Sequence, residues 1–457
     1  MTAVILIIIG VLLFELIVGI HEFGHFITAK KSGIQVNEFA LGMGPKIFGF
    51  KKGETQYSLR LIPIGGYCAM EGEDEDSNNP RSFEKAKVWK RMIVVIAGAV
   101  MNILLGFILM FVVVVQQSTY SSTTIDSFPE LSYSQNSGLQ AGDKLLKING
   151  TSIVSSRDIS FALATTKPVE VDGTELTVYQ EDCLVNLFSF LGTTLSERNE
   201  AIKNGETDYM SDQDAQAMYS EYLQIVENVN SAETLEEAQS AYEDGYKSLY
   251  AYVSDEEAQV PQIEVKESRI RFRVDILVER AGRQVLLEDV DFYTYLNSET
   301  QQPMVAVDFY TVPVERTFLT AVSESFKQTV SIGKMVWDSL VGIVTGKFGL
   351  SELSGPIGTA SAISQITSQS LASSGFIDGL NTLIFMMAFI TVNLGIFNML
   401  PFPALDGGRF VMLIIEAIRK KPVSMKIQNA INASGFIILI GFMLIISMKD
   451  IWQIIGG

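Results

Sequence analysis

Four apolar stretches constrain this chain more than any other feature of its sequence. They occupy residues 4–28, 92–115, 378–400 and 431–448. A helix that crosses the hydrocarbon core of a bilayer needs about 20 predominantly apolar residues. Because unpaired backbone amides and carbonyls are costly in lipid, such stretches have to be helical. The sequence therefore predicts a polytopic α-helical membrane protein with about four transmembrane helices.

The first stretch also has the position of a cleaved signal peptide. Such a peptide would need a basic residue before the apolar run and a small-residue cleavage site after it. No Lys or Arg precedes the run, and residues 21–25 (HEFGH) lie where cleavage would occur. A retained helix is therefore the favoured interpretation.

The distribution of charge predicts an orientation in the membrane. Lys and Arg cluster between residues 30 and 91 and again between residues 409 and 426, so the positive-inside rule places both connections in the cytoplasm. Both termini and the segment 118–317 then face outward. The net charge of −18 resides mainly in that segment, and such an acidic surface disfavours nucleic-acid binding. Cys68 and Cys183 fall on opposite sides of the membrane, so we expect no disulfide between them.

The remaining segments alternate between strand-like and helix-like patterns. Gly and Pro punctuate short β-prone runs in residues 33–72, which predicts hairpins. Residues 137–153 resemble a strand–turn–strand followed by a helix, and residues 195–258 predict a helical hairpin. Strands are expected on both sides of the Ala281-Gly282 turn. Residues 317–345 predict an amphipathic helix on the bilayer surface.

Residues 21–25 place two imidazoles and a carboxylate inside the first apolar stretch. On a helix, His21 and His25 lie one turn apart on one face, where both can bind a single Zn²⁺ with Glu22 aimed at its water. A five-residue pattern also arises by chance. Ionisable residues at this depth usually mark function, however, and the motif uses both histidines of the chain, which favours a metal site. Gly19 and Gly24 also permit close approach of another helix.

A catalytic zinc site needs a third protein ligand, and the chain has no third histidine. Cys68 is one alternative, although it lies in the predicted hairpins. Asp406 is a lone acid in an apolar stretch, just after a segment broken by prolines. It could instead cap the helix that begins at Gly407 and Gly408. Because the two histidines lack a third donor, the ligand interpretation of Asp406 is favoured.

This set of residues predicts peptide hydrolysis at or inside the bilayer. Zinc would lower the pKa of its water, and Glu22 would take the proton and pass it to the leaving amine. Asn398 could donate a hydrogen bond to the substrate or its oxyanion, and an interhelical hydrogen bond is an equally good interpretation of it.

The paired motifs resemble those of the site-2 protease family of intramembrane zinc metalloproteases. The first motif is residues 21–25, and the second comprises Asn398, Pro401, Pro403, Leu405, Asp406 and Gly407. Three further segments match the family: "GMGPKIFGF", "LRLIPIGGYCAMEGE" and "SGPIGTA". The Gly-Pro that the family has near the second span is Gly98-Ala99 here, whereas Asn102 is kept. The resemblance covers nearly the whole chain outside residues 167–268.

The resemblance implies a role for each matching residue. His21, His25 and Asp406 would bind Zn²⁺, and Glu22 would be the catalytic acid and base. The hairpins of residues 33–72 would form a membrane-reentrant loop that presents the substrate. Substrate-binding residues would be Asn398, Gly65, Gly66, Pro401 and Pro403.

The resemblance also implies a domain organisation in a bacterial plasma membrane. Residues 137–150 ("SGLQAGDKLLKING") resemble the core of an extracytoplasmic PDZ domain, which a helical insertion at about 167–268 would interrupt. We expect a helix with the HEFGH motif (1–30), a reentrant loop and cytosolic linker (31–87), a second transmembrane helix (88–117), the α+β PDZ-like domain (118–316), an amphipathic interfacial helix and linker (317–376), a transmembrane segment with the second motif (377–420) and a final transmembrane helix (421–457).

The implied substrates are single-span membrane proteins that a site-1 protease has already trimmed, such as anti-sigma factors or remnant signal peptides. One alternative function is an inactive membrane scaffold or receptor that binds exported chains through its PDZ-like domain. Another is a transporter with a metal or proton path, a class that usually shows more spans and a repeat symmetry.

Overall fold

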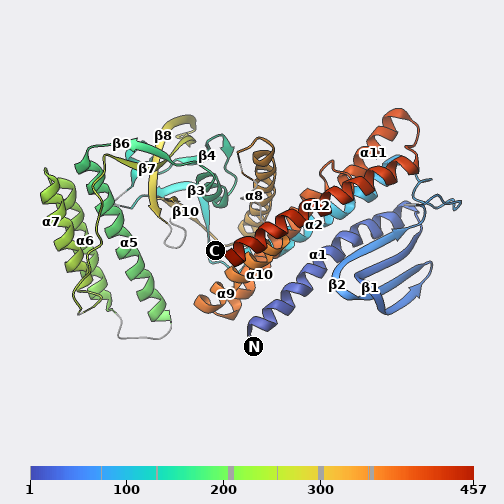
Figure 1. Ribbon diagram of the computed structural model, residues 1–457, viewed down its shortest axis with the longest axis horizontal. Coiled ribbons are helices and arrows are strands. Elements are labelled where there is room, and N and C mark those ends of the chain that lie inside the picture. Colours follow the sequence, from blue (N-terminus) through green and yellow to red (C-terminus); the bar gives the residue numbers. More distant parts are fainter. Residues whose placement is uncertain are drawn as a thin grey trace. The chain divides into compact units, whose positions relative to one another are not determined.

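The computed structural model describes residues 2–73, 75–129, 132–203, 210–254, 256–296, 303–347, 349 and 355–456. It divides into two compact units (Figure 1). The first unit comprises Met1–Ser121 and Pro313–Gly457, and the second comprises Ser122–Val312.

Four long helices dominate the first unit. They are α1 (Thr2–Ser32), α2 (Val88–Val114), α10 (Phe376–Asn398) and α12 (Met425–Gly456). In the described part of the chain, these four are long and apolar enough to cross a membrane, with mean hydropathies of 1.5, 2.7, 1.9 and 2.2 in their apolar segments. The expectation of a polytopic membrane protein is therefore confirmed. The unit also contains α8 (Phe318–Val344), α9 (Pro356–Ser374) and α11 (Asp406–Arg419).

Glycines allow α1, α2 and α10 to pack closely. A Cβ at Gly24 of α1 would lie 2.5 Å from the carbonyl oxygen of Ala97 in α2, and a Cβ at Gly106 of α2 would lie 2.4 Å from Val392 in α10. Van der Waals packing at small residues is one of the forces that drive helix association in lipid. Gly19 differs from the expectation, because it faces Leu41 of a strand rather than another helix.

Two long strands, β1 (Val36–Lys52) and β2 (Thr55–Met70), lie against α1 (Figure 1). The two strands pair antiparallel, beginning at Lys52 and Thr55 beside the connecting turn. Irregularities in the register bring two parts of β2 next to β1, so that Leu41 pairs with both Leu59 and Gly66. Three large apolar side chains of this sheet, Ile47, Phe48 and Leu61, are at least 60% exposed. Such exposure suits a hairpin that contacts lipid.

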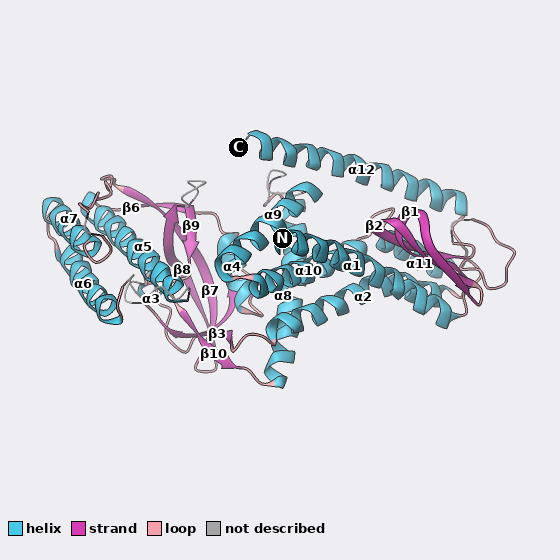
Figure 2. Cartoon of the chain, turned by 90° about the horizontal axis from the view of Figure 1, so that it is seen from below, coloured by secondary structure: helices cyan, strands magenta, loops and turns pink. Residues whose placement is uncertain are grey.

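The second unit is built on a sheet with the strand order β10-β3-β4-β7-β8-β9, and Figure 2 draws its strands in magenta. The strands are β3 (Thr119–Ser127), β4 (Lys144–Ile148), β7 (Ser268–Arg280), β8 (Arg283–Leu296), β9 (Pro303–Ala306) and β10 (Tyr310–Glu315), with β5 (Thr151–Ser152) on β4 and β6 (Val169–Asp172) on β7. The short helices are α3 (Tyr133–Asn136) and α4 (Ser156–Ala164). The predicted turn joins β7 to β8, where Ala281 and Gly282 have φ angles of 49° and 75°. Positive φ at both central residues is typical of a tight hairpin turn.

A three-helix bundle lies between β6 and β7 in the sequence of the second unit. It consists of α5 (Glu175–Lys203), α6 (Asp212–Ser231) and α7 (Leu235–Tyr250), and its core contains Tyr179, Leu187, Met218 and Tyr242. Helices α6 and α7 fall where a helical hairpin was expected. Helix α5 lies mostly before the expected hairpin but within the helical insertion expected at about 167–268, and Tyr179, Cys183, Leu187 and Leu191 recur at every fourth position of its buried face.

Candidate metal centre

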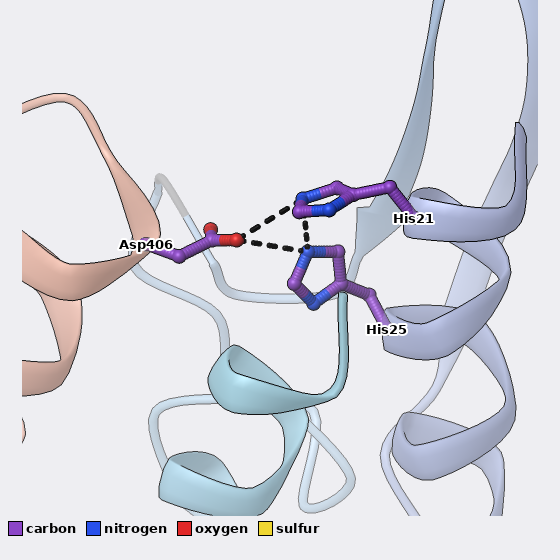
Figure 3. Close-up of side chains that lie close together, drawn as sticks. All are labelled: His21, His25 and Asp406. Atoms are coloured by element: carbon purple, nitrogen blue, oxygen red, sulfur yellow. Dashed lines mark hydrogen bonds and ion pairs between the residues drawn. The ribbon is translucent and has the colours of Figure 1, made fainter. Parts of the chain in front are cut away.

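His21 and His25 lie one turn apart on α1 and point to the same side (Figure 3). Both side chains are buried, and their Nε2 atoms are 3.2 Å apart. The i, i+4 spacing of an α-helix produces this arrangement directly.

Asp406, the first residue of α11, reaches both imidazoles. Its Oδ2 atom lies 3.1 Å from Nε2 of His21 and 3.3 Å from Nε2 of His25 (Figure 3). Leu405 occupies the N-cap position of α11, and no side chain caps this helix end. The carboxylate of Asp406 is therefore directed at the histidines rather than used as a cap.

The local backbone explains how Asp406, at the start of α11, reaches α1. A Cβ at Gly407 would lie 2.1 Å from the carbonyl oxygen of Leu400, and one at Gly408 would lie 2.3 Å from that of Phe402. Only glycines let the loop 399–405 fold so closely onto the start of α11. Ala404 adopts a φ of 74°, a strained conformation for a residue with a Cβ, and such strain often occurs at functional sites.

Two ion pairs hold α11 in place. Arg91 of α2 pairs with Glu416 near the end of α11, and both residues are buried. Arg409 of α11 pairs with Glu73, which follows β2. The helix that carries Asp406 is thus fixed to α2 and to the end of the hairpin.

The three facing atoms fit one zinc ion. A tetrahedral zinc ion with bonds of about 2.0–2.1 Å separates its ligand atoms by about 3.3 Å. The observed separations are 3.1, 3.2 and 3.3 Å. Oδ2 of Asp406 is buried and makes no hydrogen bond in the described structure, although it lies this close to two nitrogens. Lone pairs that converge on a common point explain this geometry better than hydrogen bonds do. Within the described residues, His21, His25 and Asp406 form the one cluster of metal-ligand type.

The outer ring nitrogens fix the tautomers that zinc requires. Nδ1 of His25 donates to the backbone carbonyl of Val94 at 2.8 Å, which leaves Nε2 with a lone pair. Nδ1 of His21 lies 3.2 Å from the side-chain amide of Asn102. Oδ1 of Asn102 is buried without a hydrogen-bond partner. The oxygen and the nitrogen of an Asn amide have nearly the same shape, so the Asn102 amide can be turned by 180°. In that orientation Oδ1 accepts the Nδ1–H of His21.

Gly98 of α2 makes room for both imidazoles. A Cβ at this position would lie 2.6 Å from Nε2 of His25 and 2.7 Å from Cε1 of His21. No other residue fits without displacing the rings. No pattern in the sequence points to Val94, and Gly98 and Asn102 were noted only as part of the resemblance.

Glu22 lies outside this cluster, on the face of α1 that meets β2. A Cβ at Gly66 would lie 3.5 Å from Cγ of Glu22 and 3.8 Å from Val18. The carboxylate is therefore located between the metal-ligand cluster and strand β2.

The structure places only some of the other predicted site residues beside the metal-ligand cluster. The amide of Asn398 lies 3.3 Å from Nε2 of His21. Gly65 has a φ of 95° and packs on Met43, and Pro401 is exposed. Pro403 packs against Gly435 of α12, which indicates a structural contact. Cys68, the alternative third ligand, is buried beside Ala29 and Met70 and is not part of the metal-ligand cluster.

These features define a multi-pass membrane protein with an HExxH metal centre completed by a distant aspartate. Residues 9–442 match the family model of peptidase family M50. The chain therefore belongs to peptidase family M50, the site-2 protease family, and is a zinc metalloprotease.

Relatives match along almost the whole chain. The regulator of sigma-W protease RasP of Bacillus subtilis is 28% identical over 456 residues, which cover 97% of each chain. The zinc metalloprotease RasP of Shouchella clausii is 26% identical over 464 residues, which cover 96% of this chain and 97% of that one. A protein of Clostridium perfringens with a provisional zinc metalloprotease name is 29% identical over 448 residues, which cover 97% of this chain and 98% of that one.

Proposed function

We propose that this zinc metalloprotease cleaves peptide bonds within the transmembrane segments of single-span membrane proteins. The observation that carries the proposal is the convergence of three ligand atoms within 3.3 Å of one another, two of them from a helix that is apolar enough to cross a membrane. In this proposal His21, His25 and Asp406 hold the zinc ion. When bound, zinc supplies Lewis acidity and lowers the pKa of the attacking water.

Glu22 is the proposed catalytic acid and base. It follows His21 directly, so it lies beside the ligand cluster without belonging to it. From this position its carboxylate takes a proton from the attacking water and gives it to the leaving amine. Asn398, whose amide lies close to His21, would donate a hydrogen bond to the substrate carbonyl.

Strand β2 is the proposed support for the substrate. A transmembrane helix hides its carbonyls in i to i−4 hydrogen bonds, so the scissile segment has to unwind before attack. An unwound segment can pair with a strand edge. Gly66 of β2 lies next to Glu22, so a substrate strand that paired with this part of β2 would come close to the catalytic carboxylate.

The second unit is proposed to be an extracytoplasmic PDZ-like domain interrupted by the three-helix bundle. Support comes from a groove between α4 and β9, lined by Leu163, Ala164, Phe272, Met304 and Val305. A groove between a helix and a strand is the place where such domains take up a peptide by strand addition. The domain boundaries given above remain predictions.

The orientation and substrates follow from the same proposal. Both termini and the second unit face outward from a bacterial plasma membrane, because the basic residues cluster in the other connections. The name of the B. subtilis relative refers to sigma-W, which supports anti-sigma factors as one substrate class. Remnant signal peptides are a second class, and prior trimming by a site-1 protease would expose both.

The Glu22→Gln variant tests this function. We expect it to bind zinc like the wild type but to lose cleavage of a single-span reporter in vesicles, because only the proton carrier is removed. Unchanged cleavage would refute the role of Glu22. An inactive scaffold would show no cleavage with the wild type either, and the presence of all four catalytic residues speaks against it.

A further inference from the structure

Glu15 is a second carboxylate in the first membrane-spanning helix, and the metal centre does not use it. It lies inside the apolar span Ile9–Ser32. Both of its carboxylate oxygens are buried, and they have no hydrogen-bond partner among the described residues. A charged side chain at the centre of a membrane helix is costly, so such residues usually serve function. A buried polar group without a partner requires an explanation of its own.

The location of Glu15 points to the substrate path. Glu15 precedes Glu22 by seven residues, or two turns, so both lie on one face of α1 together with Val18. This face meets the hairpin, because Gly66 lies beside Val18 and Glu22. The backbone amide of Gly42 in β1 lies near the Glu15 carboxylate, at a geometry that falls short of a hydrogen bond.

Another face of α1 is available to lipid. Leu12, Leu16 and Phe23 are 62%, 44% and 37% exposed. Glu15 borders this exposed face, one turn before Gly19, and Gly19 packs against Leu41 of the hairpin. The carboxylate of Glu15 therefore faces the space between α1 and the hairpin, where the proposed substrate strand would lie.

We propose that Glu15 is a specificity-determining residue that binds a lysine or arginine side chain of the substrate. The inference rests on the proposed function. Seven helical residues separate Glu15 from Glu22 by about 10 Å along α1. An extended strand advances about 3.3 Å per residue. The basic side chain would thus lie about three residues from the scissile bond, toward the N-terminal end of α1.

The preference for a cation follows from the burial of the carboxylate. Lys and Arg form charge-assisted hydrogen bonds with a carboxylate, and these are stronger than neutral ones. An apolar side chain at the same substrate position would leave the Glu15 oxygens buried and unpaired, which is costly. Substrates with a basic residue there are therefore cleaved in preference to apolar ones.

Selectivity measured in vesicles tests the proposal. Reporters carry Lys or Leu at each position two to four residues from the scissile bond, on the side that lies toward the N-terminus of α1. We expect the wild type to give a three- to ten-fold higher kcat/KM for Lys than for Leu at one of these positions. This fold-change corresponds to about 0.6–1.5 kcal/mol, which lies in the range that hydrogen bonds within membranes and hydrogen bonds to charged groups contribute. Glu15→Gln brings this ratio close to one, whereas the lipid-facing control Leu12→Ala keeps the wild-type ratio. An equal ratio in the wild type and in Glu15→Gln would overturn the proposal.

Cross-linking separates this inference from the proposed function. Glu15→Cys in the Glu22→Gln background should form a disulfide with a reporter cysteine at the same position, while Leu12→Cys should not. A cross-link without any cleavage by the wild type would contradict intramembrane proteolysis and keep the Glu15 contact. Cleavage without a cross-link at any of the three positions would contradict the Glu15 contact alone.

Discussion

The side-chain amide of Asn102 lies 3.2 Å from Nδ1 of His21, the ring nitrogen that does not face Asp406. Groups that orient metal-binding imidazoles in this way typically contribute 10- to 100-fold to metal affinity. We predict that Asn102→Ala weakens zinc binding by about 10- to 100-fold, because His21 loses the acceptor that holds its tautomer. Competition with a fluorescent chelator measures this. Asn381→Ala, in α10 and paired with Gln116, is the control and should bind zinc like the wild type. Equal affinities of all three proteins would contradict the role of Asn102.

Asp406→Ala should lower the zinc content from about one ion per chain to well below one, because only two imidazoles remain as protein ligands. Elemental analysis of purified protein measures the content. Asp378→Ala, in the first turn of α10, removes an exposed acid without touching the cluster and should retain zinc. Full occupancy in Asp406→Ala would move the third ligand to another residue.

Gly98→Ala is predicted to reduce cleavage by about 100-fold or more, since a Cβ 2.6 Å from Nε2 of His25 has to displace the ring. Initial rates on a single-span reporter measure the effect. Gly441→Ala offers a matched control in α12, where a Cβ would meet nothing within 4 Å. Wild-type rates for Gly98→Ala would show that the imidazoles are placed differently.

Glu54, which lies in the β1–β2 turn outside the spanning helices, predicts how the stability of this hairpin depends on pH. Hydrogen bonds from Arg81 and Lys30 lower the pKa of Glu54 from 4.5 to about 2, and burial opposes this shift. A lowered pKa in the folded state means that the stabilisation is complete above about pH 4.5 and is lost as the pH falls toward about 2. Because these ion pairs are partly exposed, we expect a contribution of only roughly 0.2–1 kcal/mol each.

Hydrogen exchange of residues 50–58 measures this effect. Exchange in the wild type should rise as the pH is lowered from about 4.5 toward 2, after correction for the intrinsic rate. Glu54→Gln should show the faster exchange already at neutral pH, whereas Asp76→Asn, which changes another exposed acid, should behave like the wild type. A neutral-pH profile of Glu54→Gln identical to that of the wild type would contradict the prediction.

The spanning helices and the association of the three proposed ligands could both be predicted from the sequence, each for a physical reason. Membrane helices are long and uniformly apolar, and the i, i+4 spacing of His21 and His25 leaves little choice of geometry. Asp406 was assigned because a two-histidine site lacked a donor. Its path to α1 depends on the loop 399–405 and on Gly407 and Gly408, which no local pattern specifies.

Other features depend on tertiary packing and could not be predicted. The acceptor for His25 is the backbone carbonyl of Val94, which any residue type would supply. Helix α9 has few strongly apolar residues and was expected to be a linker. Glu15 was visible in the sequence as an acid in an apolar run, but only the fold shows that its oxygens are buried next to the hairpin.

X-ray absorption at the zinc edge of the metal-loaded protein tests the proposed coordination most directly. We predict two imidazole nitrogens at about 2.0–2.1 Å and oxygen ligands at a similar distance, with loss of the imidazole pattern in the double variant His21→Ala, His25→Ala. A sulfur ligand at about 2.3 Å, which Cys68 or Cys183 would have to supply, or a site with no imidazole would contradict coordination by His21, His25 and Asp406.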